Sequence, residues 1–429
     1  MDRQRYQYII VGGGCAGLWL LHELSTQHYS SILVEQEPLG AYASTRNQSW
    51  LHSGALYAVG LETLASRHET ECAASMATGH ECIQAFEEMV RFCPEAFQQE
   101  SECLFAFNNE HDLTLASENL ETLGVHAQAL TLDQLIHKEP SVFVTHGAFR
   151  FGLATKDIPF NSHVFLSHLL RTALDAGGEI HKTERKIAGL EIGRDGRSWV
   201  VKDDKRVIEG DILIFAAGAL MPRMMKQLDV LSNLELKIQK CLVLVLHQRL
   251  CDRVISLRRA GSGDLNLVPF ENGTTVNLGG TDGIAADETD EHFDEARYAD
   301  VVNAVGRYIP GIQQCGAHFY VCQKLNNARS SSHDRQEYGN RHYFWAEVPS
   351  DDLYFFYPGK FTLGKIGARE FVNHLSSLYS STGRSSLVAL PTSPPSMAVP
   401  YQGDPSEILV RTDDKTLERQ KIRNRFRQQ

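Results

Sequence analysis

Residues 8–35 form a pattern that few folds accommodate: an apolar strand, a glycine-rich turn, a helix and a second strand. The apolar run Tyr8–Val11 leads directly into Gly12, Gly14 and Gly17, which have the spacing G-x-G-x-x-G. The first glycine permits a tight turn, the second lets a pyrophosphate approach the backbone, and the third lets the helix lie close to the strand. Glu35 ends the second strand, where a carboxylate can hold a ribose hydroxyl. The pattern predicts a Rossmann-type dinucleotide site, and a glycine-rich turn without a ligand is the alternative.

Length and charge narrow the function classes. A chain of 429 residues suits two to three domains, or one enzyme with interleaved domains. Its net charge of −11 argues against nucleic acid as a partner. It has no apolar stretch of about eighteen residues, so we expect no membrane span. Nine cysteines without a C-x-x-C pair predict reduced thiols, a cytoplasmic location and no metal site.

Two later segments also predict a strand followed by a turn that contains glycine. The apolar run 211–215 ends on Ala216, Ala217 and Gly218, which would let a ligand lie against the backbone. A close crossing of helix and strand is the alternative. Near the C-terminus, DLYFFYPGKFTLGKIGAREF predicts a strand, a Pro-Gly turn and a helix. Between them, residues 237–280 alternate apolar and polar side chains and predict an antiparallel sheet.

With these motifs in hand, the chain resembles flavoproteins of the D-amino-acid oxidase superfamily, and within it glycerol-3-phosphate and L-2-hydroxyglutarate dehydrogenases or oxidases. Arg46-Asn47-Gln48 followed by His52-Ser53-Gly54 and Tyr57 is similar to a loop of the hydroxyglutarate type, with Gln48 where a serine is usual. The run 211–218 is similar to the family's strand ending Ala-Ala-Gly. Residues 267–269 and 279–282 are similar to its sheet motifs. Residues 359–362 are similar to a lysine-containing turn, with Pro358 where that family has a glycine and without its later Tyr-Arg pair.

The resemblance implies bound FAD, and it implies the fold class: α/β, with a Rossmann-type FAD-binding domain and an interleaved antiparallel-sheet substrate domain. We expect the FAD-binding domain at 1–80, 150–230 and 340–384, the substrate or cap domain at 81–149 and 231–339, and a Pro-rich linker with a basic tail at 385–429. No second nicotinamide-binding glycine motif is evident, which lowers the expectation of an NAD(P)H reductase.

The resemblance and the motifs together give two sets of candidate residues. The expected catalytic side chains are His52, Arg46, Lys360, Arg329 and Arg335, because a histidine beside a flavin can act as a base and guanidinium groups match carboxylates and phosphates. His52 could instead only hold its loop by hydrogen bonds, or could be joined covalently to FAD. The expected FAD-binding residues are Gly12, Gly14, Cys15, Ala16, Gly17, Glu35, Gln36, Thr45, Arg46, Asn47, Gln48, His52, Ser53, Gly54, Ile187, Ala216, Ala217, Gly218, Gly359, Lys360, Phe361 and Thr362.

These features predict an FAD-dependent dehydrogenase or oxidase that removes hydride from a C–H next to a hydroxyl or amine. The expected substrate is a small anionic hydroxy acid, amino acid or related amine, and the expected electron acceptor is oxygen or a quinone. Two alternatives stay open: a flavin-dependent tailoring enzyme that acts on a larger or carrier-bound intermediate, and a non-enzymatic flavin-binding scaffold or sensor. The basic tail is interpreted as flexible, or as a contact in an oligomer.

Overall fold

The computed structural model describes residues 2–60, 69–98, 101–143, 148–231, 236–258, 264–278, 283–291, 299, 302–303, 305–309, 312, 315–327, 343–348 and 351–381. These residues form two compact units. The first unit comprises the described residues within 2–45 and 163–237 and those from Leu325 onward. The second unit comprises the described residues within 46–162 and 238–324. The described residues within 46–80 and 150–162, which we expected in the FAD-binding domain, therefore group with the second unit.

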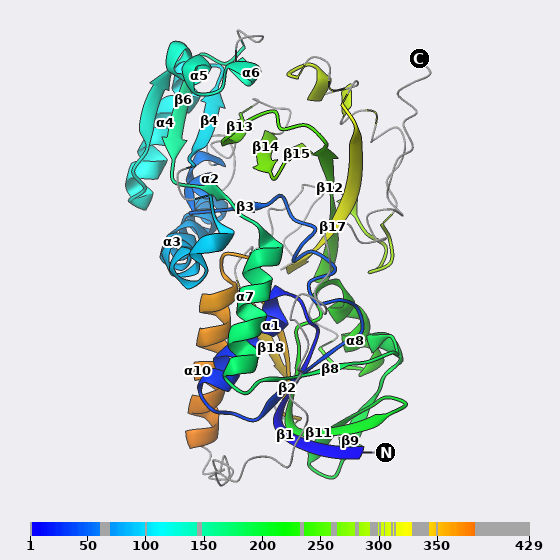
Figure 1. Cartoon of the computed structure of the whole chain (residues 1–429). Helices are drawn as coiled ribbons and strands as arrows, with labels where there is room; N and C mark the ends of the chain where they lie inside the picture. The colour runs from blue at the N-terminus through cyan, green and yellow to red at the C-terminus, as the bar shows by residue number, and fades with distance from the viewer. Residues whose placement is uncertain are drawn as a thin grey trace. The chain divides into compact units, whose positions relative to one another are not determined.

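The first unit is built on a mostly parallel sheet in the strand order β18-β19-β11-β1-β2-β8 (Figure 1). Five strands of this sheet are parallel to one another: β1 (Asp2–Val11), β2 (Ser31–Glu35), β8 (Glu179–Lys182), β11 (Arg206–Phe215) and β19 (Leu353–Tyr357). At one edge, β18 (Phe344–Val348) pairs antiparallel with β19. Off this path, β10 (Ser198–Lys202) pairs antiparallel with β11, and β9 (Glu191–Asp195) pairs antiparallel with β10. Residues 8–11 are fully buried, as expected of a parallel strand covered on both faces.

The helices α1 (Cys15–Thr26), α7 (Ser162–Asp175) and α10 (Gly364–Ser381) lie together in Figure 1. Trp19 of α1 packs on Phe165 of α7, with ring centroids 6.0 Å apart, and Phe165 meets Phe361 at 5.4 Å. Gly364 lies so close to Trp19 that an added Cβ would be 2.6 Å from its indole ring. The short elements η3 (Ile187–Gly189), η4 (Gly218–Leu220) and α8 (Met221–Gln227) complete this unit.

The second unit contains a nine-stranded sheet in the order β16-β12-β15-β14-β13-β4-β6-β5, with β17 paired to β12. Its strands are β4 (Cys103–Phe107), β5 (Gln128–Thr131), β6 (Phe151–Thr155), β12 (Leu236–Leu246), β13 (Val254–Leu257), β14 (Leu265–Phe270), β15 (Gly273–Leu278), β16 (Gly283–Ile284) and β17 (Ala317–Asn327). Along the order from β16 to β5, the pairing is antiparallel except between β13 and β4. A Rossmann-type sheet and an antiparallel sheet in one chain confirm the predicted fold class.

The second unit has further elements outside this sheet. They are β3 (Trp50–Leu51), which pairs with β7 (Ile158–Pro159), and the helices α2 (Ala55–Val59), α3 (Glu69–Phe92), η2 (Pro94–Ala96), α4 (Glu110–Leu123), α5 (Leu132–Lys138) and α6 (Pro140–Phe143). Eight cysteine side chains are described, and none of them forms a disulfide, as predicted. Within the described ranges, no helix is long and apolar enough to span a membrane.

Candidate functional site

Three predicted segments meet at the carboxyl edge of the first unit's sheet. Strand β11 runs parallel between β1 and β19, with Val11 beside Phe215 and Phe215 beside Phe355. The residues that follow these strands therefore leave the sheet at the same edge: the turn at Gly12, the segment 216–218 and the turn 359–362. Open α/β sheets bind ligands at this edge.

The glycine turn has the geometry that its spacing predicts. Gly12 has φ +117°, and an added Cβ would lie 2.7 Å from the carbonyl oxygen of Ala216. An added Cβ at Gly17 would overlap the carbonyl oxygen of Gly12, so the start of α1 contacts the turn backbone directly. Gly14 precedes α1 as its N-cap, without a capping side chain, and the first turn of the helix contains no acidic residue. Its positive end is therefore suited to an anion.

Two acceptor side chains fix the approach to this turn. Glu35, 7% exposed, accepts hydrogen bonds from the amides of Gly13 at 2.5 Å, Gln36 at 2.6 Å and Glu37 at 2.8 Å. Burial raises the pKa of this carboxyl, and the three amides oppose that shift. The side-chain carbonyl of Gln36 accepts a hydrogen bond from the amide of Ile187, which joins two of the predicted FAD-binding residues.

The remaining candidates of the first unit lie in two turns. The hydroxyl of Ser44 accepts a hydrogen bond from the amide of Cys15 at 2.8 Å, and Thr45 donates its hydroxyl to the carbonyl of Gly40 at 2.6 Å. Ser44 was not among the predicted residues. Its contact joins the segment before Arg46 to the N-terminus of α1.

The Pro-Gly turn closes through its own backbone, where the amide of Lys360 donates to the carbonyl of Pro358 at 2.7 Å. Gly359 has φ +70°, which favours glycine, and the side chain of Thr362 is buried. The helix expected after this turn begins at Gly364, so Phe361 precedes it.

The loop 46–54 belongs to the second unit and is fixed there by a buried carboxylate. Asp157 is fully buried and accepts three hydrogen bonds. The donors are the amide of Ser53 at 2.7 Å, the hydroxyl of Ser53 at 2.9 Å and the hydroxyl of Thr155 at 2.9 Å. Burial raises the pKa of Asp157, and these donors oppose the shift. Asp157 was not predicted, although its network orders the predicted Ser53.

The first half of the loop has its own long-range contacts. Arg46 is buried and forms an ion pair with Glu291. The carbonyl of Asn47 accepts a hydrogen bond from the hydroxyl of Tyr320, and the carbonyl of Gln48 accepts one from Thr275 at 2.8 Å. Burial raises the pKa of Tyr320, which keeps this hydroxyl protonated as a donor.

The second half of the loop contains the candidate base. The ring of His52 lies against Trp50, with centroids 4.5 Å apart and an interplanar angle of 58°. Gly54 has φ +103°, and an added Cβ would be 2.5 Å from the carbonyl oxygen of Gly79. The tight packing of Gly54 and the anchored Ser53 hold the chain on the C-terminal side of His52.

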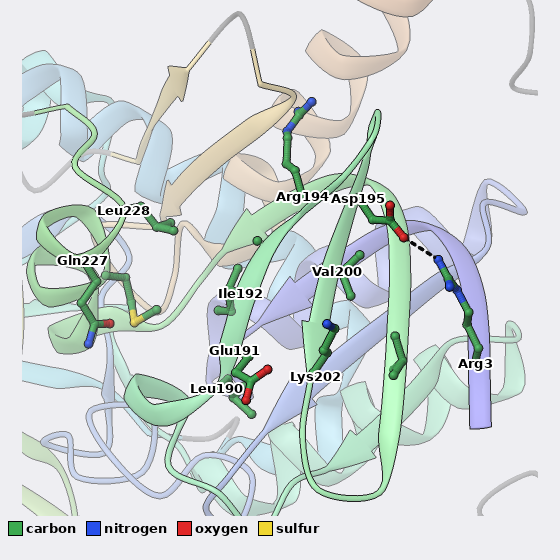
Figure 2. Close-up of a pocket in the computed structure, with 13 residues that line it drawn as sticks. Arg3, Leu190, Glu191, Ile192, Arg194, Asp195, Val200, Lys202, Gln227 and Leu228 are labelled. Carbon is green, nitrogen blue, oxygen red and sulfur yellow. Dashed lines mark hydrogen bonds and ion pairs between the residues drawn. The ribbon is translucent and has the colours of Figure 1, made fainter. Parts of the chain in front are cut away.

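Other predicted residues are not at these places. Arg329, Arg335, the motif 279–282 and the tail 385–429 lie outside the described residues. A cavity of about 840 Å³ lies beside β9 and β10 and includes Arg3, Asp195, Lys202 and Gln227 (Figure 2). Arg3 donates to Asp195 at 2.8 Å across it. None of the residues lining this cavity belongs to the predicted cofactor or catalytic set, so it does not correspond to the predicted site.

The residues at the sheet edge fit a flavin dinucleotide. The N-terminus of α1 suits a pyrophosphate, and Glu35 stands at the end of β2, where a ribose would be held. The glycines at 12 and 17 leave no room for a side chain where backbone segments meet. These features agree with FAD as the bound group.

Comparison with known proteins supports the same interpretation. Residues 7–356 match the model of the family described as FAD dependent oxidoreductase. One component of the anaerobic glycerol-3-phosphate dehydrogenase of Escherichia coli is 26% identical over 319 residues, which are 70% of this chain and 53% of that protein. The chain therefore spans about half the length of this relative. A probable FAD-dependent oxidoreductase of Pseudomonas aeruginosa is 47% identical over 51 residues, which are 12% of this chain and 13% of that protein.

Solved structures show the same fold at low identity. Glycine oxidase from Geobacillus kaustophilus aligns with a TM-score of 0.65 and 15% identity, over 87% of this chain and 95% of that one. Glycerol-3-phosphate dehydrogenase from Bacillus halodurans, complexed with FAD, aligns with a TM-score of 0.63 and 14% identity, over 88% and 65%. Since the family model covers most of the sequence, this chain belongs to the FAD dependent oxidoreductase family.

Proposed function

We propose that this enzyme oxidises a C–H next to a hydroxyl or an amine in a small anionic substrate, by hydride transfer to the flavin. The single observation behind the substrate charge is Arg46, a buried guanidinium on a loop with several anchors. A buried arginine presents a planar fork of donors that matches a carboxylate or a phosphate. The names of the relatives agree, since glycerol phosphate and glycine are both anion-bearing substrates.

The proposal assigns roles to the residues of both units. In this proposal FAD is the two-electron acceptor. It would be held by Gly12 to Gly17, Glu35, Gln36, Thr45, Ile187, the segment 216–218 and the turn 359–362. The loop that begins at Arg46 would bind the substrate. Asn47, Gln48, Ser53 and Gly54 would shape this loop.

In this proposal Arg46 would bind the anionic group, and His52 would take the proton of the substrate hydroxyl or amine as hydride leaves the neighbouring carbon. Arg46 would exchange its present partner Glu291 for the substrate anion, and Glu291 would then bind an ammonium group in an amine substrate. Lys360, Arg329 and Arg335 remain further candidates for anion binding. Their contribution can be separated from that of Arg46 by single substitutions.

An anaerobic substrate screen tests the function. FAD-loaded enzyme is mixed in a stopped-flow instrument with hydroxy acids, amino acids, phosphorylated polyols and matched uncharged alcohols, and loss of the visible flavin absorption is followed. We expect reduction by at least one carboxylate- or phosphate-bearing compound, and much slower reduction by its uncharged analogue. A protein that takes up FAD and is reduced by dithionite but by none of these compounds would contradict the proposal.

A substitution at Arg46 tests its assigned role. We expect Arg46→Met to raise the Kd of the reducing substrate by about 10- to 100-fold, the range of one charged hydrogen-bonding contact. Arg91→Met is the matched control, because Arg91 pairs with Glu87 on the exposed face of α3 in the same unit.

A separate experiment identifies the electron acceptor. The reduced enzyme is exposed to oxygen and to a soluble quinone in separate runs, and the return of the flavin absorption is followed.

A further inference from the structure

Two histidine rings, neither of which has a role above, meet on neighbouring strands of the second unit. His247 directly follows β12, and His318 is the second residue of β17, the strand that pairs with β12. Nε2 of His247 and Nδ1 of His318 are 2.8 Å apart, and the ring centroids are 5.1 Å apart. His247 is exposed and His318 is partly exposed, so an ion from solvent can reach both nitrogens.

The backbone and a glycine hold this pair in place. The amide of His247 donates to the carbonyl of Gly316 at 2.8 Å, which joins the ends of the two strands beside the rings. The ring of His247 lies against Gly316, where an added Cβ would be 3.0 Å from Nδ1. The pair is therefore positioned by main-chain contacts as well as by side-chain rotamers.

We propose that His247 and His318 form a binding site for a divalent transition-metal ion of the nickel or copper type. In the present hydrogen bond, one ring nitrogen donates its proton to the lone pair of the other. To bind a metal ion, both of these nitrogens must be unprotonated. The ring that now donates meets this condition when its proton moves to its other nitrogen, which is the second tautomer of a neutral imidazole. The metal would then link β12 to β17.

The separation of the two nitrogens limits how far the rings must move to bind a metal ion. The observed 2.8 Å is a hydrogen-bond distance, so the rings must turn until both lone pairs point at the ion. With metal–nitrogen bonds of about 2.0–2.1 Å, two ligands at a right angle stand about 2.9 Å apart, whereas tetrahedral ligands stand about 3.4 Å apart. A square-planar or octahedral ion, the geometry that Ni²⁺ and Cu²⁺ prefer, therefore needs the smaller change in the separation of the two nitrogens.

Water would complete the coordination. In the part of the chain that the structure describes, no third His, Cys, Asp or Glu joins these two rings in a cluster of ligand atoms. Cys315 is near in sequence, but its thiol donates to the side chain of Gln248 at 3.1 Å, and burial raises its pKa, which favours the protonated thiol over a metal-binding thiolate.

The test is a calorimetric titration of FAD-loaded, tag-free enzyme with Ni²⁺ at pH 8, where an ordinary imidazole is neutral. We expect one high-affinity Ni²⁺ per chain and a Kd that rises at least tenfold in His247→Ala and in His318→Ala. His126→Ala, which removes an exposed histidine of the same unit, should bind as the original enzyme does. Ni²⁺ should also raise the Tm of the original enzyme and of His126→Ala, but not of the other two variants.

Folding is checked in each variant by its flavin content and its Tm without metal, and we expect both to be unchanged because neither histidine is buried. The proposal is overturned if the original enzyme binds no Ni²⁺, or if the double variant His247→Ala/His318→Ala binds it with unchanged stoichiometry and affinity. Because the readout is metal binding, neither result depends on the substrate.

Discussion

Replacing Asp157 tests whether one buried carboxylate fixes the loop 46–54. Asp157 accepts three hydrogen bonds from Ser53 and Thr155 and has no exposed surface. In Asp157→Ala, three donors lose their acceptor inside the protein. Each buried group left without a partner costs about 1–3 kcal/mol, and hydroxyl groups recover part of this by rotating. We therefore expect the free energy of unfolding to fall by about 3–5 kcal/mol.

Asp157→Asn should cost less, about 1–2 kcal/mol. Its side-chain carbonyl can still accept from the amide of Ser53, and its NH₂ group can donate to the hydroxyls of Ser53 and Thr155, which also serve as acceptors. The substitution also removes the buried charge whose cost raises the pKa of Asp157. The order of stability is therefore original enzyme, Asn variant, Ala variant.

The assay is urea unfolding of the FAD-loaded enzyme, followed by tryptophan fluorescence, with the flavin content of each variant measured beforehand. Asp133→Asn is the control, because this carboxylate is exposed on α5 and should change stability by no more than about 0.5 kcal/mol. An Ala variant as stable as this control would refute the argument that Asp157 holds the loop.

The pH dependence gives an independent check. Burial raises the pKa of Asp157 in the folded state above its unfolded value, so the folded protein binds this proton more tightly. Asp157 therefore makes stability fall as pH rises from the ordinary aspartate pKa of about 3.9 to the raised folded value. Asp157→Asn should lose this component of the stability–pH curve, and an unchanged curve would contradict the assigned shift.

Three further predictions concern other parts of the molecule. Gly17→Ala should abolish FAD retention, measured as the flavin-to-protein ratio, because its Cβ would overlap the carbonyl of Gly12; Gly193→Ala, with open space around its Cβ, should retain FAD. His52→Ala should keep FAD but slow anaerobic flavin reduction by about 10²–10⁴-fold, the usual contribution of a general base; full turnover in this variant would leave His52 a structural residue. Asp203→Asn should lower the free energy of unfolding at pH 7. Burial alone would raise the pKa of Asp203, but the amides of Lys205 and Arg206 and the ring of His181 lower it to about 2, so the folded state stabilises the carboxylate. The difference in stability between the two proteins should disappear as pH falls from about 4 toward 2, which unfolding experiments at a series of pH values measure.

The sequence predicted the parts of this molecule that local physics determines. Gly17 packs on the carbonyl of Gly12 five residues earlier, and Gly12 has φ +117°, so the spacing of the two glycines indicates the turn. The strand 211–215 was recognised in the same way, since its apolar run ends on small residues. Helix α4 was not predicted, although Asn109 caps it by accepting from the amide of Asp112, and Gly124 ends it with φ +76°. Those two signals could have located it.

The contacts that order the loop 46–54 could not be predicted from the sequence. Ser53 and Asp157 are 104 residues apart, Arg46 and Glu291 are 245 apart, and Asn47 and Tyr320 are 273 apart. No local pattern marks an acid as the partner of a distant serine, since Asp157 stands in a turn-like segment that carries no motif. Only the folded sheet of the second unit brings these groups together.

The division between Thr45 and Arg46 separates two kinds of requirement. On one side, Ser44 and Thr45 complete the turn geometry at the start of α1 through hydrogen bonds to Cys15 and Gly40, and any dinucleotide site needs such a frame. On the other side, every anchor of the loop belongs to the second unit, and each anchor binds a backbone group or a charged side chain of this particular loop. Hydride transfer requires the substrate to be held within a fraction of an ångström of a productive geometry. A loop with four independent anchors can provide that precision, and substituting its anchors should therefore change substrate turnover more than retention of FAD.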